Sequence, residues 1–152
     1  MLATGDMSSD SAAYAISLLD DTVVLRLNGV SQARAPLPKP RKDWHHVAVT
    51  WSGAATEARI FINGIEANRR QFAPRRLEYS FDRDLLIGAG PGTRKAERFV
   101  GRVAALRLYD RALSGTDIRR LMDDDHHVHA TFEDGNPMAL ALRDPDDRTA
   151  LA

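Results

Sequence analysis

The stretch WHHVAVTW (44–51) brings together side chains that bind metals and side chains that stack on sugars. Two adjacent imidazoles are potential metal ligands, and the flanking tryptophans offer flat apolar faces. The apolar alternation that follows is typical of a β-strand, where neighbouring side chains point to opposite faces. We therefore predict that His45 lies on the core side with Val47 and His46 on the other face, so that the pair does not hold one metal ion.

Four arginines surround Phe72 in the stretch RRQFAPRR (69–76). Guanidinium groups beside an aromatic ring can stack on bases or bind anionic sugars. The simpler interpretation is a solvated strand face, because the rest of the chain does not extend the patch into a basic stripe. Since 21 basic residues balance 21 acidic ones, we expect no nucleic-acid partner.

Two pairs of carboxylates, Asp20 with Asp21 and Asp82 with Asp84, lie in expected turns. Turn conformation alone favours aspartate at such positions. Sandwich glycosidases place catalytic carboxylates two residues apart on one strand face, and Asp82 with Asp84 comes nearest to that spacing. Arg83 and the turn context argue against a catalytic pair, and neither a Gly-x-Ser-x-Gly nor a His-Glu-x-x-His motif occurs. We predict that the chain is not an enzyme.

The elements that must position these residues are mainly strands, because the dominant apolar period is two and turn residues interrupt it at short intervals. Asn63 and Gly64 form a strong hairpin signal, since both tolerate a positive φ. One short helix is expected in LSGTDIRRLMDD (113–124), where Ser114 and Asp117 form a capping box. Its apolar stripe is Ile118, Leu121 and Met122. The strands are expected at 13–19, 22–28, 44–51, 58–72 with a central turn, 84–90 and 98–110.

The length of 152 residues suits one domain with a hydrophobic core, and the chain contains no cysteine. The N-terminal residues have no basic region followed by an apolar run, so no signal peptide is expected. No stretch approaches the roughly 20 apolar residues of a spanning helix, so we expect no membrane insertion.

Four segments in this order resemble the laminin G-like, or concanavalin A-like, jelly-roll domains. They are DWHHVAVTWSG (43–53), ARIFINGIEA (58–67), LLIGAGPG (85–92) and FVGRVAALRLYDRALSGTDIRRL (99–121). The resemblance implies an all-β antiparallel jelly-roll sandwich over residues 12–122 with one short C-terminal helix. The alternation independently predicts three apolar stripes for its core. They are Val47 with Val49 and Trp51, Ile60 with Ile62, and Leu106 with Leu108.

The same resemblance implies a non-catalytic binding module of a larger protein, with carbohydrate or another extracellular ligand, and an extracellular or cell-surface location. A sugar site needs an exposed aromatic ring and polar groups, for which the candidates are Phe61, Phe72, Arg69 and Arg70. Relatives often hold calcium at a loop rim, which makes Asp20, Asp21, Asp82 and Asp84 candidate ligands. The alternative is a structural or protein-interaction module that binds no sugar and packs on neighbouring domains or on copies of itself.

The sequence departs from the family pattern in two places. Ala104 and Ala105 stand where relatives often carry an acidic pair, and the usual opening strands are expected before residue 12, where this chain has no clear counterpart. The tail, 123–152, carries acidic residues and histidines at 126, 127 and 129. A solvated linker explains this composition better than a zinc site. We expect the tail to be either a closing strand or the start of a following domain.

Overall fold

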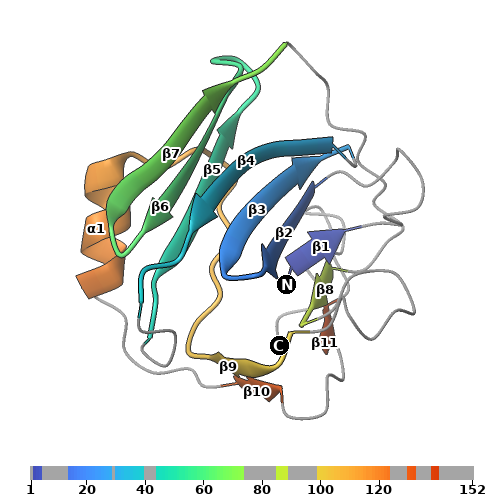
Figure 1. The fold of residues 1–152 in the computed structure, drawn as a ribbon. Helices are drawn as coiled ribbons and strands as arrows, with labels where there is room; N and C mark the ends of the chain where they lie inside the picture. Colours follow the sequence, from blue (N-terminus) through green and yellow to red (C-terminus); the bar gives the residue numbers. More distant parts are fainter. Residues whose placement is uncertain are drawn as a thin grey trace, which may run out of the picture.

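The computed structural model describes residues 2–4, 14–28, 30–39, 44–73, 85–88, 99–123, 130–132 and 138–140 (Figure 1). Within these ranges nearly all regular structure is β-strand, as the apolar alternation predicts. The strands are β1 (Leu2–Thr4), β2 (Tyr14–Leu19), β3 (Thr22–Leu27), β4 (Val30–Pro36), β5 (Val47–Ser52), β6 (Glu57–Ile62), β7 (Ile65–Gln71), β8 (Leu85–Ile87), β9 (Gly101–Val103), β10 (Ala130–Phe132) and β11 (Met138–Leu140). The helix is α1 (Gly115–Asp123).

Two sheets face each other and enclose the core. One sheet has the strand order β11-β8-β1-β2-β3-β4, the second has the order β5-β6-β7, and β9 pairs with β10 in a small third sheet. Neighbouring strands are antiparallel. The main core cluster joins side chains of β3 and β4 to side chains of β6: Val23, Leu25, Leu27, Ala33, Ala35, Ala58, Ile60 and Ile62. The fold is thus the predicted jelly-roll sandwich.

Hairpins connect consecutive strands where the sequence predicts them. Asp20 and Asp21 join β2 to β3 with φ of 45° and 63°, and Asn63 and Gly64 join β6 to β7 with φ of 50° and 75°. Two consecutive positive φ angles are what a type I′ turn requires. The aspartates near residue 20 therefore have a conformational reason to be there.

Helix α1 lies against the side of the β5-β6-β7 sheet that faces away from the core. Phe61 points to this side, and a Cβ built on Gly115 would lie 3.3 Å from its Cε1 atom. A Cβ on Gly64 would lie 2.9 Å from Cγ of Arg119, so the hairpin tip and the helix are also closely packed. Ile118 is buried, as predicted for the helix stripe, whereas Leu121 and Met122 are partly buried.

The predicted capping box is present at the start of α1. The Asp117 backbone N–H donates to Ser114 Oγ at 3.2 Å, and the Ser114 backbone N–H donates to Asp117 Oδ2 at 3.2 Å. Ser114 Oγ also lies 2.7 Å from Asp117 Oδ2. The side-chain and backbone hydrogen bonds from Ser114 lower the pKa of Asp117. The carboxylate form is therefore the one that stabilises the helix.

Acidification is expected to weaken this cap. Because the pKa of Asp117 is lower in the folded chain than in the unfolded one, its contribution is complete above the pKa of a free aspartate, about 3.9, and is lost as the pH falls below that value. Thermal unfolding of the wild type and Asp117→Asn should therefore differ at neutral pH and converge in acid. A gap that stays constant with pH would contradict this role of the carboxylate.

The third apolar stripe is a prediction that the structure corrects. The structure describes residues 99–110 of the expected strand 98–110. Among these, only Gly101–Val103 forms a strand, and Leu106 and Leu108 are 42% and 50% exposed. The physical reason is the pairing: β9 pairs with β10 over three residues, and β5 has β6 as its strand partner, so neither ladder continues into 104–109. Val47, at the first position of β5, is also more exposed than predicted, whereas Val49 and Trp51 pack on the core.

Both ends of the chain contribute strands. β1, which precedes residue 12, pairs with β2 and β8. From the segment 123–152, β10 pairs with β9 and β11 pairs with β8. The division of the chain at residue 123 stays a prediction.

Candidate binding groove between strands β4 and β7

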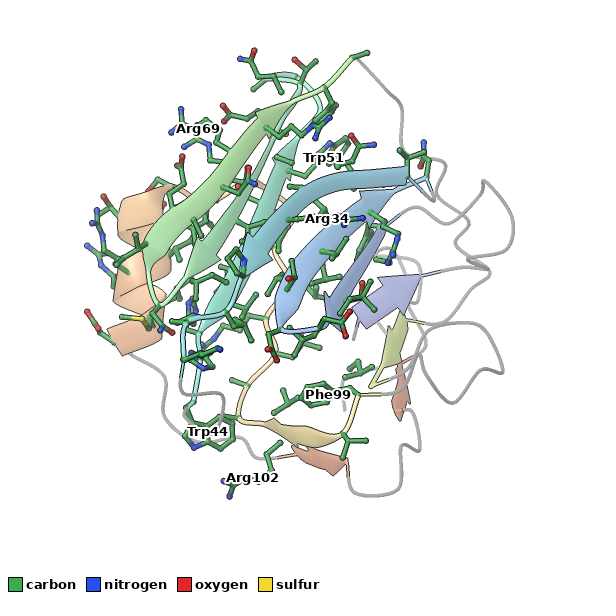
Figure 2. All side chains as sticks on the ribbon, in the orientation of Figure 1. Arg34, Trp44, Trp51, Arg69, Phe99 and Arg102 are labelled. Carbon is green, nitrogen blue, oxygen red and sulfur yellow. The ribbon has the colours of Figure 1, made fainter. Side chains whose placement is uncertain are left out.

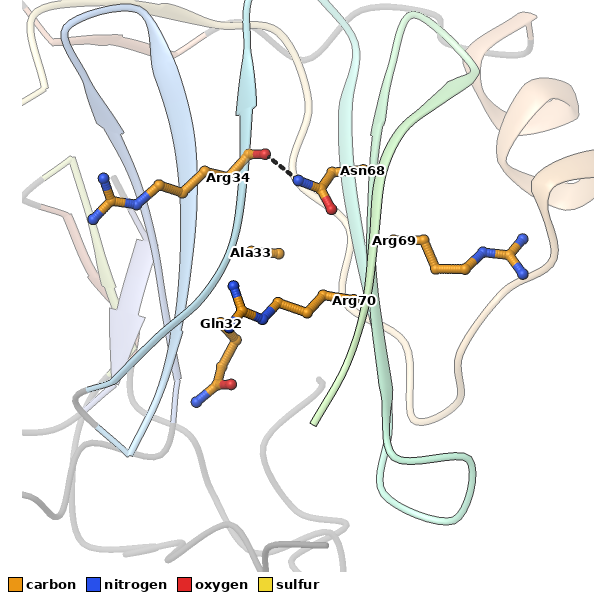
Figure 3. A pocket seen from close by; sticks show the side chains of 6 residues that line it. All are labelled: Gln32, Ala33, Arg34, Asn68, Arg69 and Arg70. Atoms are coloured by element: carbon orange, nitrogen blue, oxygen red, sulfur yellow. Dashed lines mark hydrogen bonds between the residues drawn. The ribbon is translucent and has the colours of Figure 1, made fainter. Parts of the chain in front are cut away.

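An open groove of about 400 Å³ runs between β4 and β7, the edge strands of the two large sheets (Figure 3). Six residues line it: Gln32, Ala33, Arg34, Asn68, Arg69 and Arg70. None of them is acidic or aromatic. The groove is therefore a polar, cationic opening at the side of the sandwich.

The register of β7 places its polar side chains on two different faces. Asn68 lies opposite Ile60 and Arg70 lies opposite Ala58, and both of these partners are core residues. Residues directly opposite in an antiparallel pair share a face, so Asn68 and Arg70 project toward β4. Figure 3 shows the Arg70 side chain extending from β7 to Gln32 on β4.

Asn68 joins the two sheets across the groove. Its Nδ2 atom donates to the backbone oxygen of Arg34 at 2.6 Å, while the Arg34 side chain points away from β7 (Figure 3). Gln32 is 7% exposed and lies where the β3–β4 register shifts. Such an irregularity redirects a side chain relative to regular alternation. The groove therefore presents two amides and one guanidinium, that of Arg70.

Arg69, although it follows Asn68 directly, belongs to the opposite face of the sheet. Its Nε donates to Glu66 Oε1 at 2.8 Å and its Nη2 to Glu66 Oε2 at 3.0 Å, and Nη1 lies 3.8 Å from Glu57 Oε2. The hydrogen bond from Arg69 lowers the pKa of Glu66, and the same bond raises the pKa of Arg69. Because Glu66 neutralises the positive charge of Arg69 in this bidentate pair, Arg69 is a weaker candidate for an anionic ligand than Arg70.

Arg70 differs from Arg69 in its surroundings. No ion pair of Arg70 occurs with any carboxylate in the part of the chain that the structure describes. Its five N–H donors and the neighbouring amides suit hydroxyl groups or a carboxylate. The sequence analysis selected Arg69 and Arg70 alike as ligand candidates, and the structure shows that of the two it is Arg70 that projects into the groove. Gln32 and Asn68 carry no sequence signal that could have identified them.

Neither predicted phenylalanine lines the groove. Phe61 is 2% exposed and packs beneath α1, so the prediction that it stacks on a sugar is wrong. Alternation explains this position, since Phe61 lies between Ile60 and Ile62 and must face away from the core. Phe72 is partly buried and stacks on Trp51, with ring centroids 6.3 Å apart and planes inclined by 14°. Its ring is thus engaged within the protein.

The predicted calcium ligands are only partly described. Asp20 and Asp21 occupy the β2–β3 turn, and the Asp21 backbone oxygen accepts a bond from the Leu37 backbone N–H at 2.7 Å. Asp82 and Asp84 lie outside the described residues. Within the described ranges no three histidine or acidic side chains gather in a way that could hold a metal ion. Calcium binding stays a prediction.

The histidine pair is a structural feature of the start of β5. His46 donates its backbone N–H to Asn63 Oδ1 at 3.0 Å and accepts the Asn63 backbone N–H at 2.8 Å. Both ring nitrogens of His45 are buried without a hydrogen-bond partner among the described residues. Trp44, which the sequence analysis did not select as a ligand-binding residue, is 52% exposed, and its ring lies 5.2 Å from Cζ of Arg102.

A solved structure with the same architecture supports the fold. A heptameric SAP-like pentraxin from Limulus polyphemus matches with a TM-score of 0.67 and 14% identity, over 91% of this chain and 74% of that chain. An S-layer domain-containing protein from Clostridium thermocellum (residues 221–444) matches with a TM-score of 0.41 and 21% identity, over 66% of this chain and 50% of that chain. No curated protein matches.

No helix within the described ranges has the length and the apolar run that a membrane crossing requires. The family model described as "Concanavalin A-like lectin/glucanases superfamily", a laminin G model, matches residues 5–119. This match covers most of the chain and includes β2 to β9 and the start of α1. The chain belongs to the concanavalin A-like lectin/glucanase superfamily.

Proposed function

We propose that this domain is a non-catalytic module that binds a carbohydrate in the groove between β4 and β7. The observation that carries the proposal is the Arg70 guanidinium, which projects into a polar opening between the amides of Gln32 and Asn68. Amides and guanidinium groups match the hydroxyl and carboxylate groups of sugars. Membership of this family supports an extracellular or cell-surface location. It also supports a role as an accessory part of a larger protein.

Binding without hydrolysis is the form of the proposal that suits the groove. The family description includes glucanases as well as lectins, and a glycosidase needs two carboxyl groups that flank the scissile bond. The residues that line the groove include no aspartate or glutamate. Glu57 on β6 and Glu66 on β7 form ion pairs with Arg59 and Arg69 on the opposite face of the sheet.

Replacement of Arg70 by glutamine is expected to weaken carbohydrate binding by about 10- to 100-fold, because a hydrogen bond to a charged group contributes roughly 1.5–3 kcal/mol. A glycan array would identify the ligand, and isothermal titration would measure its affinity for both proteins. Arg69→Gln is the matched control, since it removes a neighbouring arginine whose side chain is paired on the other face. Equal losses in the two variants, or none in Arg70→Gln, would contradict the groove assignment.

A protein-interaction role is the second candidate, and exposed apolar side chains on both sides of β9 favour it. Val100, Leu106, Leu108 and Tyr109 are 72%, 42%, 50% and 48% exposed. Several large apolar side chains in one exposed segment are typical of a contact surface. Light scattering over a range of protein concentrations distinguishes the candidates. A self-associating protein without glycan binding would support the interaction role and reject the sugar-binding one.

A further inference from the structure

A tryptophan and an arginine that are distant in sequence meet at a surface of the molecule that the groove does not include. Cζ of Arg102 lies 5.2 Å from the centroid of the Trp44 ring, and both residues are exposed (Figure 2). A cation over an indole face is attracted by the ring quadrupole with about 0.5–1 kcal/mol at an exposed site. The attraction therefore favours contact between the two side chains in the free protein.

The protein backbone fixes Trp44 from one side. Two residues after it, His46 is tied to the tip of the β6–β7 hairpin by the reciprocal bonds with Asn63. That tip is itself packed on α1, where a Cβ at Gly64 would lie 2.9 Å from Arg119 Cγ. The backbone two residues after Trp44 is thus fixed by its bonds to the hairpin, which in turn packs on α1.

The backbone fixes Arg102 from the other side. Phe99 and Val103 pack against the buried Ile87. These contacts fix the chain on both sides of Arg102. Gly101 has a φ of 154°, and a Cβ there would lie 2.8 Å from Cζ of Phe99, so the chain passes this ring closely. Because neighbours on a strand point to opposite faces, Arg102 projects outward while Val103 projects inward.

The pair combines a cationic group and an exposed aromatic side chain. No carboxylate among the described residues forms an ion pair with Arg102. A guanidinium beside an aromatic face keeps its N–H donors available for a planar or tetrahedral oxyanion. The exposed part of the indole offers an apolar face beside that cation.

We propose that Trp44 and Arg102 form a second binding site, for a sugar ring that carries an oxyanion. The ring packs on the indole while its carboxylate or sulfate group pairs with the guanidinium. This site shares no residue with the groove and does not depend on the sugar-binding role proposed for it. Carboxylate and sulfate share this chemistry, and the test distinguishes them.

Fluorescence can address this site directly, since the chain contains only two tryptophans. In a Trp51→Phe background Trp44 is the sole indole. Two proteins are compared, Trp51→Phe and the double variant that also carries Arg102→Gln. Iodide, an anionic quencher, is expected to quench Trp44 about 1.5- to 3-fold more strongly in the first protein, because a nearby cation raises the local concentration of anions. Acrylamide, which is neutral, should quench both proteins equally. Equal iodide quenching in the two proteins would overturn the proximity that the site requires.

Binding is then measured with trigalacturonate, a sulfated galacto-oligosaccharide and the neutral galactotriose. An acidic sugar is expected to change Trp44 emission, and its affinity should fall with added salt. Arg102→Gln should lower this affinity at least about 10-fold. Arg102→Lys should lower it less. The preferred acidic sugar identifies the oxyanion. Trp44→Ala, followed by titration calorimetry, should weaken binding similarly, and circular dichroism checks that each variant folds.

Three results would overturn this proposal. The first is no binding of either acidic sugar, and the second is binding of neutral galactotriose as strong as that of the acidic sugars. The third is polyglutamate binding that depends on Arg102 as strongly as acidic-sugar binding does, which would assign the site to acidic peptides. Arg70→Gln separates the two sites. If Arg70→Gln abolishes acidic-sugar binding while Trp44→Ala and Arg102→Gln retain it, the groove proposal stands and this one fails. If the dependence is reversed, the groove proposal loses this ligand and the second site stands.

Discussion

Replacement of Phe61 by alanine is expected to lower the free energy of unfolding by about 3–5 kcal/mol. The side chain is 2% exposed and fills the contact between β6 and α1, where Gly115 allows the helix to approach the ring. Removing the ring leaves a cavity that the helix and the sheet can close only in part. Urea denaturation of the wild type and the variant measures the difference.

The same variant distinguishes a packing role of Phe61 from a sugar-stacking role. Under conditions where it remains folded, Phe61→Ala should bind a groove ligand as the wild type does, because the residue faces the side opposite to Asn68 and Arg70. Phe61→Leu, which retains most of the apolar volume, should lose less stability. A variant that unfolds normally but no longer binds ligand would contradict the position described for this ring.

Ile60→Ala is expected to destabilise the chain by about 2–5 kcal/mol. Ile60 is 0% exposed and lies in the core cluster where β6 faces β3 and β4. The loss combines the transfer free energy of the removed methyl and methylene groups with the cavity they leave. Thermal and urea unfolding should agree if the transition is cooperative.

Ile65→Ala is the matched control for Ile60→Ala. Ile65 starts β7, directly after the hairpin, and is 72% exposed. The same chemical change should therefore alter stability by no more than about 0.5 kcal/mol. A comparable loss in both variants would mean that Ile65 is covered in solution, as the interaction role would require, whereas no loss in Ile60→Ala would contradict the described core.

Arg69 and Arg70 show how far the sequence leads toward the site. Composition and the resemblance select both arginines as ligand candidates, and period-two alternation already assigns them to opposite faces. Which face is occupied by glutamates, and which opens between two sheets, depends on partners from other strands. The sheet register brings Glu57 and Glu66 to the face of Arg69. The packing of the two sheets brings Gln32 and the Arg34 carbonyl to the face of Arg70.

The segment 98–110 shows the opposite case, in which a local pattern predicts too much. Its alternation predicts a core strand with Leu106 and Leu108 inside, yet among its described residues, 99–110, only Gly101–Val103 is a strand. A strand needs a partner that supplies hydrogen bonds along its whole length. The pairing of β9 with β10 extends over three residues, so the pattern alone does not extend the ladder.

The sequence by itself determined the features whose causes are local. The turns at Asp20–Asp21 and Asn63–Gly64, the Ser114–Asp117 cap and the inward face of β6 each depend on neighbouring residues, and the family follows from four such segments in order. Tertiary structure alone decided the groove, the burial of Phe61 and the meeting of Trp44 with Arg102. These features depend on contacts between distant residues, which sheet register and helix packing set and residue spacing does not encode.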